Sequence, residues 1–207
     1  LRTGQWEGEL WNRRKNGEIF PEWLSIHAIH NQQGEITHYV SSFSDITELS
    51  NARDQVEFMA FHDSLTRLPN LTLVRDRLDQ SILRARRYRT KVALLCMDLD
   101  KFKYINDTHG HSIGDALLQA VAERLKQCIG RNDTLCRLSG DDFLIALYDI
   151  RELSVITNLC DQIEQALVQP FPIHQLSLRV SMSMGVSVFP DDATDTEILI
   201  KHADTAM

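Results

Sequence analysis

The sequence is poor in the features that mark membrane-spanning, disulfide-stabilised and nucleic-acid-binding proteins. Its 207 residues contain no apolar run near the ~20 residues that a membrane helix needs, and no signal peptide is visible. The four cysteines form no CxxC pair and have no histidine at zinc-ligand spacing, so we expect reduced, buried thiols in a cytoplasmic protein. The formal net charge of -7 argues against binding to a nucleic-acid backbone.

The composition is that of a folded domain, with 43% hydrophobic and 25% charged residues, enough for a core without disulfides. The chain opens at Leu1 without a methionine and stops within a helical pattern at Met207. We therefore expect a piece of a longer protein, and a membrane anchor upstream of it stays compatible with the sequence.

Residues 1–45 have the pattern of antiparallel strands. Strands are predicted at 6–13, 19–29 and 36–44, and Asn16-Gly17 between the first two is a strong hairpin signal. The stretch WEGELWNRRKNGEIFPEWLSI, followed by SDITE, resembles the C-terminal half of a PAS sensor domain. The helical half that closes a PAS ligand pocket is not in the chain, so we assign no ligand here. An unrelated β-meander is the alternative.

Residues 46–62 are predicted to form a linker helix. Leu49, Ala52, Val56 and Met59 repeat at spacings of three and four, as in the seam of a coiled coil. The helix spans under three heptads, so a simple packed linker is the alternative to a helix that transmits a signal or pairs two chains.

Residues 63–207 alternate between helical and strand patterns, which indicates an α/β domain. Amphipathic or apolar periodicity predicts helices at 71–89, 113–129, 152–168 and 195–207, and strands at 91–99, within 133–148 and along 176–189.

Two acidic pairs carry the chemistry of this second part. Asp98 and Asp100 stand where an apolar strand ends, and Asp141 and Asp142 stand in a turn between two apolar strands. Each pair alone is typical of a turn. Together they suit a hard divalent cation, Mg²⁺ or Mn²⁺, held by carboxylates and substrate phosphates. The sequence alone does not show that the two pairs meet.

The stretch between the acidic pairs offers a nucleotide contact. Lys103 can face a phosphate. Asn106 and Asp115 can recognise guanine, because a carboxylate accepts hydrogen bonds from the guanine N1–H and N2 amine, and adenine lacks that donor pair. The structural alternatives are an ordinary turn asparagine and an acidic residue that favours the start of a helix.

Four ordered motifs resemble the GGDEF family of diguanylate cyclases. They are DSLTRLPN at 63–70, DLDKFKYINDTHGHSIGD at 98–115, RLSGDDF at 137–143 and SMGVSVFPDD at 183–192. The resemblance covers residues 63–207 and implies a palm-like fold, with a central, mainly antiparallel sheet flanked by helices. It also implies a reaction in which two GTP molecules, one on each protomer of a homodimer, are joined into cyclic di-GMP.

The resemblance also assigns roles to the acidic residues. Asp98 binds Mg²⁺ together with the backbone carbonyl of Leu99. Asp141 is the second metal carboxylate and helps to deprotonate the attacking 3′-hydroxyl, and Asp142 supports the metal or its waters. For the substrate, the resemblance implies phosphate contact by Lys103.

The remaining substrate contacts follow from the same resemblance. Asn106 and Asp115 bind guanine, and Ser139 and Gly140 lie where the backbone approaches the nucleotide.

The name motif departs from the family pattern, because it is Ser139-Gly140-Asp141-Asp142-Phe143 in place of Gly-Gly-Asp-Glu-Phe. Serine restricts φ and adds bulk, and aspartate shortens the acidic arm by one methylene. Two functions therefore stay open. One is an active cyclase regulated by the PAS fragment. The other is a silent GTP-binding module that regulates an attached cyclic di-GMP phosphodiesterase (EAL) domain.

The product-inhibition motif of the family, Arg-x-x-Asp, is incomplete. Asp133 is present, but Gly130 stands in the arginine position and Arg131 follows one residue later. Feedback inhibition through this motif is therefore disfavoured, as is a function as a cyclic di-GMP receptor.

Overall fold

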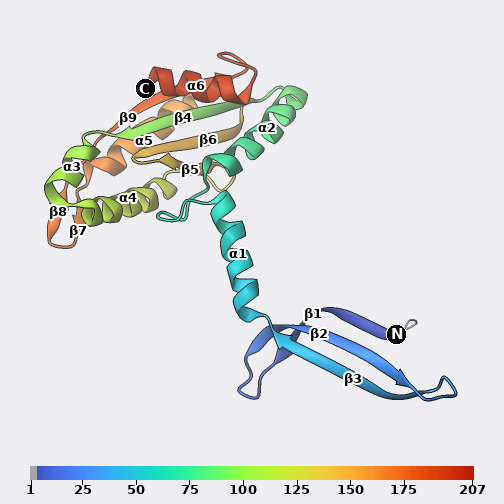
Figure 1. Ribbon diagram of the computed structural model, residues 1–207. Coiled ribbons are helices and arrows are strands. Elements are labelled where there is room, and N and C mark those ends of the chain that lie inside the picture. The colour runs from blue at the N-terminus through green and yellow to red at the C-terminus, as the bar shows by residue number, and fades with distance from the viewer. Residues whose placement is uncertain (1–3) are drawn as a thin grey trace. The chain divides into compact units, whose positions relative to one another are not determined.

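A computed structural model describes residues 4–207 and divides the chain into two compact units, Leu1–Phe58 and Met59–Met207 (Figure 1). The first three residues of the predicted PAS fragment lie outside the described residues. Among the helices of the described chain, none is long and apolar enough to cross a membrane.

The first unit is a three-stranded antiparallel sheet in the order β1-β2-β3, followed by a helix. Its elements are β1 (Gln5–Arg13), β2 (Ile19–His30), β3 (Ile36–Asp45) and most of α1 (Thr47–Phe61), whose last three residues belong to the second unit. Gly17 and Gly34 have φ of 90° and 82° in the two turns, a conformation that glycine adopts without strain. The Asp45 carboxylate accepts a hydrogen bond from the Thr47 backbone N–H at 3.0 Å and so begins α1.

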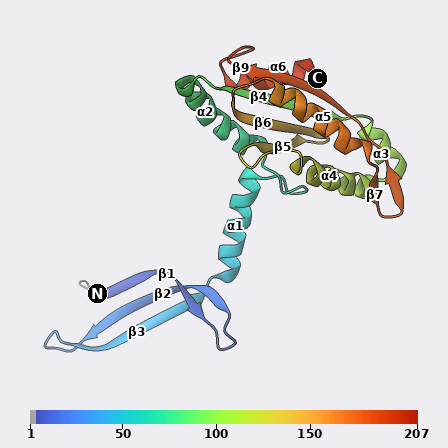
Figure 2. The same ribbon diagram turned by 180° about the vertical axis from the view of Figure 1, so that it is seen from behind.

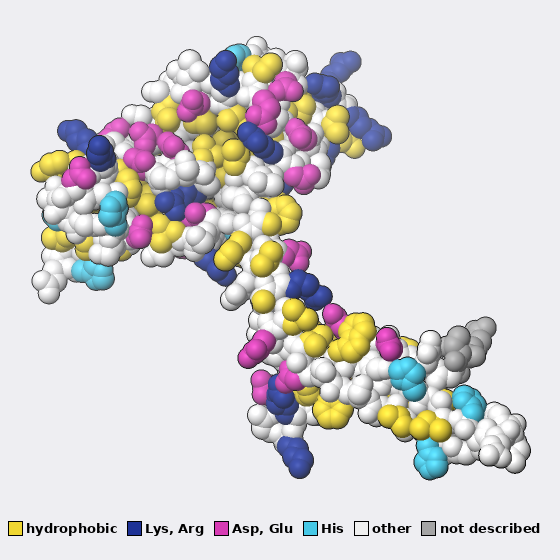
Figure 3. Space-filling view, viewed as in Figure 1, with side chains coloured by type: hydrophobic (Ala, Val, Ile, Leu, Met, Phe, Trp, Pro, Cys, Tyr) yellow, Lys and Arg dark blue, Asp and Glu magenta, His cyan; other side chains and the backbone are white. Residues whose placement is uncertain are grey.

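The helix α1 has no buried residue among those described. Leu49, Val56 and Met59 are all exposed, as are Trp11 and Phe43 on the sheet. Apolar side chains are accordingly visible along this helix in the space-filling view (Figure 3). The predicted apolar seam therefore exists as an exposed stripe.

The second unit is built on a four-stranded antiparallel sheet in the order β5-β6-β4-β9, with a separate hairpin of β7 and β8. The strands are β4 (Lys91–Leu99), β5 (Thr134–Ser139), β6 (Asp142–Ile150), β7 (Phe171–Ile173), β8 (Leu176–Leu178) and β9 (Met182–Phe189). The helices are α2 (Leu71–Tyr88), α3 (Phe102–His109), α4 (His111–Lys126), α5 (Ser154–Val168) and α6 (Thr196–Ala206). The predicted fold class, a central antiparallel sheet flanked by helices, is confirmed.

Both faces of this sheet are covered, as the two opposite views show (Figures 1 and 2). Alternation along β4 explains the two cores, because successive side chains point to opposite faces. Leu94 and Cys96 pack in the core with α2 and α6, whereas Leu95 and Met97 pack in the core with α4 and α5. The even-numbered face of β4 therefore ends at Asp98 on the side of α6.

The helix α3 and the strand β7 are not predicted by the sequence pattern. The helix α3 has eight residues and buries only Phe102 and Ile105, too few positions for a periodic signal. The predicted long strand 176–189 is broken between β8 and β9, where the carbonyl of Ser181 accepts a hydrogen bond from Asp100 N–H at 3.0 Å. The break at Ser181 thereby ties β9 to the loop after β4.

Candidate functional site

The acidic residues meet at one end of the central sheet. Asp98 on β4 lies directly opposite Asp142 on β6, and opposite Ser183 on β9. Directly paired residues of antiparallel strands project to the same face, so the strand register itself brings two of the predicted carboxylates together.

The carboxyl groups of Asp98 and Asp141 share a hydrogen bond. Burial, and then the neighbouring charge of Asp141, raises the pKa of Asp98 to about 6. The pKa of Asp142 is also raised, first by burial and then by the charges of Asp141 and Asp204. Negative charges are thus crowded at this end of the sheet. A proton or a cation between the carboxylates of Asp98 and Asp141 would relieve their repulsion.

Asp100 is fixed by two serines that the sequence analysis did not single out as functional. The hydroxyl of Ser183 donates to its carboxylate at 2.8 Å, and the hydroxyl of Ser181 donates to the other carboxylate oxygen. No local pattern marks them, because Ser183 on β9 and Ser181 just before that strand are about eighty residues away from Asp100 in the chain.

The donor set suits a divalent cation bound with a substrate. Within residues 4–207 there is no group of three or more His, Cys, Asp or Glu side chains that could hold a metal. Mg²⁺ does not need one, because it is usually bound by one or two carboxylates, waters and substrate phosphates. The neighbouring carboxylates of Asp98 and Asp141 fit that requirement. Metal binding itself, and the part of the Leu99 carbonyl in it, stay predictions.

The start of α3 lies directly after these acids. Lys101 at its N-cap has φ of 61°, and within the described chain its side chain makes no capping hydrogen bond. The first backbone N–H groups of the helix are therefore open to an anion. Lys103 is exposed in the first turn of the same helix.

The predicted guanine contacts lie together at the junction of α3 and α4. The Oδ1 atom of Asn106 is buried and has no hydrogen-bond partner among the described residues. It lies against Gly114, where a Cβ atom would stand 1.9 Å from it, and the exposed Asp115 follows in the chain. A buried acceptor without a donor is costly, and it marks a place where a ligand N–H can bind.

Arg137 stabilises the turn that carries Asp141. The Nε and Nη2 atoms of Arg137 donate to the Gly140 carbonyl at 3.0 and 2.7 Å, and Nη1 donates to the Asp63 carboxylate at 3.0 and 3.2 Å. Gly140 has φ of 52°. Ser139 does not have a positive φ in the described chain. The serine of the variant motif therefore does not have to adopt a left-handed conformation.

Asp133 of the incomplete Arg-x-x-Asp motif is turned toward its own backbone. Its carboxylate accepts hydrogen bonds from the N–H groups of Gly130 at 3.2 Å and Tyr148 at 3.4 Å. Burial raises its pKa. A Cβ at Gly130 would lie 2.9 Å from the carboxylate, and Arg131 is exposed. Asp133 therefore acts locally as a cap of its turn.

The model of the family "Diguanylate cyclase, GGDEF domain" matches residues 60–207, and the model of the PAS domain matches residues 1–48. Residues 60–207 are most of the chain.

Individual relatives agree with the family match. The bifunctional diguanylate cyclase/cyclic di-GMP phosphodiesterase MucR of Pseudomonas aeruginosa is 40% identical over 161 residues, which are 78% of this chain and 23% of MucR. The cyclic di-GMP phosphodiesterase PdeR of Escherichia coli is 33% identical over 180 residues, 86% of this chain and 27% of PdeR. The chain thus spans about a quarter of the length of these curated relatives.

A solved structure shows the same fold. The GGDEF domain of TpbB from Pseudomonas aeruginosa superposes with a TM-score of 0.69 at 32% identity, covering 70% of this chain and 85% of that one. With its ordered motifs, its antiparallel sheet and its family match, this chain belongs to the GGDEF-domain family of diguanylate cyclases, with a PAS-like segment before that domain.

Proposed function

We propose that the chain is a diguanylate cyclase that joins two GTP molecules into cyclic di-GMP with Mg²⁺ or Mn²⁺. The observation that supports this most is the convergence of Asp98 and Asp141, which lie close enough for burial and then the charge of Asp141 to raise the pKa of Asp98 to about 6. Crowded carboxylates of this kind suit a divalent cation bound with a triphosphate, because the cation neutralises their charge.

Each part of the site then has one task. Asn106 offers its unpartnered Oδ1 to a guanine N–H, and Asp115 accepts from the N1–H and N2 amine. Lys103 and the first N–H groups of α3 hold phosphate oxygens. The cation supplies neutralisation of the charge that develops on the phosphates.

The chemical step is an in-line displacement. The 3′-hydroxyl of one GTP attacks the α-phosphorus of the other, and Asp141 accepts the hydroxyl proton. A 3′-O–P bond forms, the bond from the α-phosphorus to the bridging oxygen breaks, and pyrophosphate leaves with that electron pair. Repeating the step with the roles of the two nucleotides exchanged closes the ring.

The reaction needs two nucleotides face to face, so the proposal includes a homodimer. The exposed apolar stripe of Leu49, Val56 and Met59 on α1 supports pairing of two chains through this helix. Because α1 lies between the PAS-like segment and Asp63, a PAS input that changes the pairing would change how the sites face one another. GTP as substrate implies a cytoplasmic location.

The second candidate is a GTP-binding module without turnover that regulates an EAL phosphodiesterase domain. It is favoured by the shorter Asp142 in the name motif and by the similarity to PdeR, whose name describes a phosphodiesterase. Both candidates need the same GTP contacts, and only the first needs Asp141 as a proton acceptor.

One assay separates them. The full-length protein is incubated with GTP and Mg²⁺ and cyclic di-GMP is measured by chromatography, beside Asp141→Ala and the control Asp161→Ala, an exposed aspartate on α5. We expect product from the wild type and from the control, and none from Asp141→Ala. GTP binding without product in the wild type would select the regulatory module. An unchanged preference for GTP over ATP in Asp115→Ala would remove the guanine assignment.

A further inference from the structure

A mostly apolar pocket lies at the end of the central sheet opposite to the acidic site, between the end of α2, the start of β4 and the end of β9 (Figures 1 and 2). Its volume is about 310 Å³, within the range of about 300–1,000 Å³ that is usual for small-molecule sites. Lys91 begins β4 and Asp98 lies near its end, so roughly 20 Å of extended strand separates the pocket from the acidic site. A ligand in this pocket would therefore leave the nucleotide site free.

The base of the pocket is apolar. Ala85 of α2 and Phe189 of β9 both line it, and both are buried in the core that the sheet forms with α2 and α6. Phe189 pairs directly with Val92 of β4, which fixes the position of its backbone at this end of the sheet. The exposed Pro190 adds a second ring at the edge and has no backbone N–H. The base thus offers a ligand apolar surface and few hydrogen-bond donors.

The rim of the pocket is positively charged. No acidic side chain lines it within the described part of the chain, whereas three basic side chains do: Arg86, Arg89 and Lys91. The Arg86 guanidinium lies 5.8 Å from the centre of the Phe189 ring, and its Nη2 atom donates to the Thr194 carbonyl at 2.8 Å, so this cation is held in place. Lys91 forms an ion pair with Asp191. Arg89 is therefore the cation of the rim that is left for a ligand.

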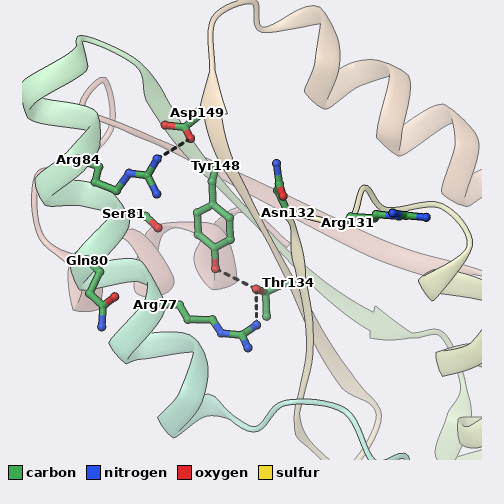
Figure 4. A pocket seen from close by; sticks show the side chains of 9 residues that line it. All are labelled: Arg77, Gln80, Ser81, Arg84, Arg131, Asn132, Thr134, Tyr148 and Asp149. Atoms are coloured by element: carbon green, nitrogen blue, oxygen red, sulfur yellow. Dashed lines mark hydrogen bonds and ion pairs between the residues drawn. The ribbon is translucent and has the colours of Figure 1, made fainter.

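The other arginines of α2 are engaged on a different side of the helix. Arg77 donates to Thr134 on β5 (Figure 4). Arg84 forms an ion pair with Asp149 on β6 in the same view. Because each residue turns an α-helix by about 100°, Arg86 lies nearly opposite to Arg84 around the helix axis. The cations of the apolar pocket are thus a separate group.

Arg89 occupies a backbone position that favours glycine. It ends α2 in the left-handed conformation, with φ of 54° and ψ of 39°, and its backbone N–H donates to the Ala85 carbonyl. Glycine adopts this conformation without strain, whereas a residue with a Cβ atom is held in it at a cost. The Arg89 side chain is exposed and has no hydrogen-bond or ion-pair partner within residues 4–207. A ligand that needs this cation would account for an arginine at such a position.

We propose that this pocket binds a small aromatic carboxylate. A flat ring packs on Pro190 and Ala85 beside the Arg86 guanidinium, a group that stacks well on aromatic faces. The carboxylate accepts hydrogen bonds from Arg89 at the rim, since a guanidinium binds a carboxylate in a bidentate way. A ligand rich in phosphate fits less well, because the apolar base has no donors for its additional oxygens.

The test is saturation-transfer NMR on the full-length protein, without GTP or divalent cations, at millimolar probe concentrations. Three probes of similar size separate the two interactions. Benzoate has the ring and the charge, benzamide has the ring without the charge, and cyclohexanecarboxylate has the charge without a flat ring. We expect benzoate to bind and the other two to bind ~10-fold more weakly or worse, because each lacks one interaction.

Two variants remove the cation of Arg89. Arg89→Gly also relieves the backbone, and Arg89→Gln keeps most of the side-chain length. Each should weaken benzoate binding ~10-fold or more, since the charge-assisted hydrogen bonds are lost. The control is Arg87→Ala, which removes the same charge from α2 at a position that does not line the pocket. It should stay within about twofold, because it acts on the ligand only through screened solvent.

The thermal stability of Arg89→Gly separates a binding residue from a structural one. Because glycine suits the left-handed conformation, this variant should melt at or above the wild-type temperature while it loses benzoate. An arginine that only ends the helix would leave benzoate binding unchanged on substitution.

Four results would each overturn the proposal. They are no saturation transfer to benzoate in the wild type, equal binding of benzamide, unchanged benzoate affinity in the two Arg89 variants, and equal weakening by Arg87→Ala. Since neither nucleotide nor metal is present, none of these results depends on whether the protein makes cyclic di-GMP.

Discussion

Arg137 is expected to stabilise the turn that carries Asp141, and its removal provides the sharpest test of the local architecture. Its side chain is 10% exposed and that of Asp63 is 21% exposed, so the pair is much better shielded than a surface ion pair. Arg137→Ala removes the guanidinium donor from the Gly140 carbonyl and from the Asp63 carboxylate, which keeps only its hydrogen bonds from Thr66. Breaking a fully buried pair costs about 3–5 kcal/mol and an exposed one about 0–1, which places this change at roughly 2–3 kcal/mol.

The substitution Arg137→Lys is the matched control for charge. Lysine keeps the positive charge but lacks the planar fork with which the guanidinium reaches Asp63 and Gly140 from separate nitrogens, so we expect it to recover less than half of the lost stability. Urea unfolding should be followed by circular dichroism at 222 nm, because all three tryptophans, Trp6, Trp11 and Trp23, lie in the first unit. A midpoint for Arg137→Ala equal to that of the wild type would refute the reasoning.

The pH dependence of this pair has a definite sign. Burial acts to raise the pKa of Asp63, but hydrogen bonds from Thr66 and Arg137 outweigh it, and the pKa is lowered below its usual 3.8. The folded state therefore binds the proton less tightly than the unfolded state. The contribution of Asp63 is present above about pH 4 and is lost as the pH falls below that value. In Arg137→Ala this acid-sensitive part of the stability should shrink.

Three further predictions concern the site and its support. Asp98→Asn should stabilise the metal-free protein at pH 7.5, because the raised pKa of Asp98 means that its charged form destabilises the fold. A rise in pKa from 3.8 to about 6 corresponds to about 3 kcal/mol of folding free energy. Solvent screening of this half-buried group reduces the expected gain to roughly 1 kcal/mol. That difference should vanish below about pH 4, and a variant less stable than the wild type at pH 7.5 would count against the crowded pair. Gly114→Ala places a Cβ 1.9 Å from Asn106 Oδ1, so GTP binding should weaken ~10-fold or more in a direct titration while the fold loses about 1–2 kcal/mol; unchanged GTP affinity would contradict this. Gly185→Ala places a Cβ 2.1 Å from the backbone carbonyl oxygen of Ala203, which cannot give way, so hydrogen exchange in α6 should become markedly faster, and full protection there would show that the close approach is not needed.

Much of the fold follows from periodicity in the sequence. The apolar run that ends at Leu99 and the Asn16-Gly17 turn predict β4 and the first hairpin, because each signal is local and strong. The helix α3 was not predicted because its stabilising contacts are tertiary. Phe102 and Ile105 pack in a core with residues that are distant in sequence. The break before β9 depends likewise on a hydrogen bond between Asp100 and Ser181, about eighty residues apart.

The candidate site, like the fold, is only partly predictable from the sequence. Asp98 and Asp141 are recognisable from the sequence as acids at the ends of strands, but only the pairing of β4 with β6 brings them into contact. The unpartnered oxygen of Asn106 and the fixing of Asp100 by two serines depend on packing that no local pattern contains.

The central claim is that Asp98 and Asp141 bind one cation beside the phosphates of GTP. A crystal structure with Mn²⁺ and a non-hydrolysable GTP analogue tests it directly, because the anomalous signal of manganese locates the ion. We expect an anomalous peak within about 2.0–2.4 Å of a carboxylate oxygen of each aspartate, with a phosphate oxygen of the analogue completing the coordination. A peak elsewhere on the protein, or an analogue bound without contact to these two carboxylates, would contradict the account.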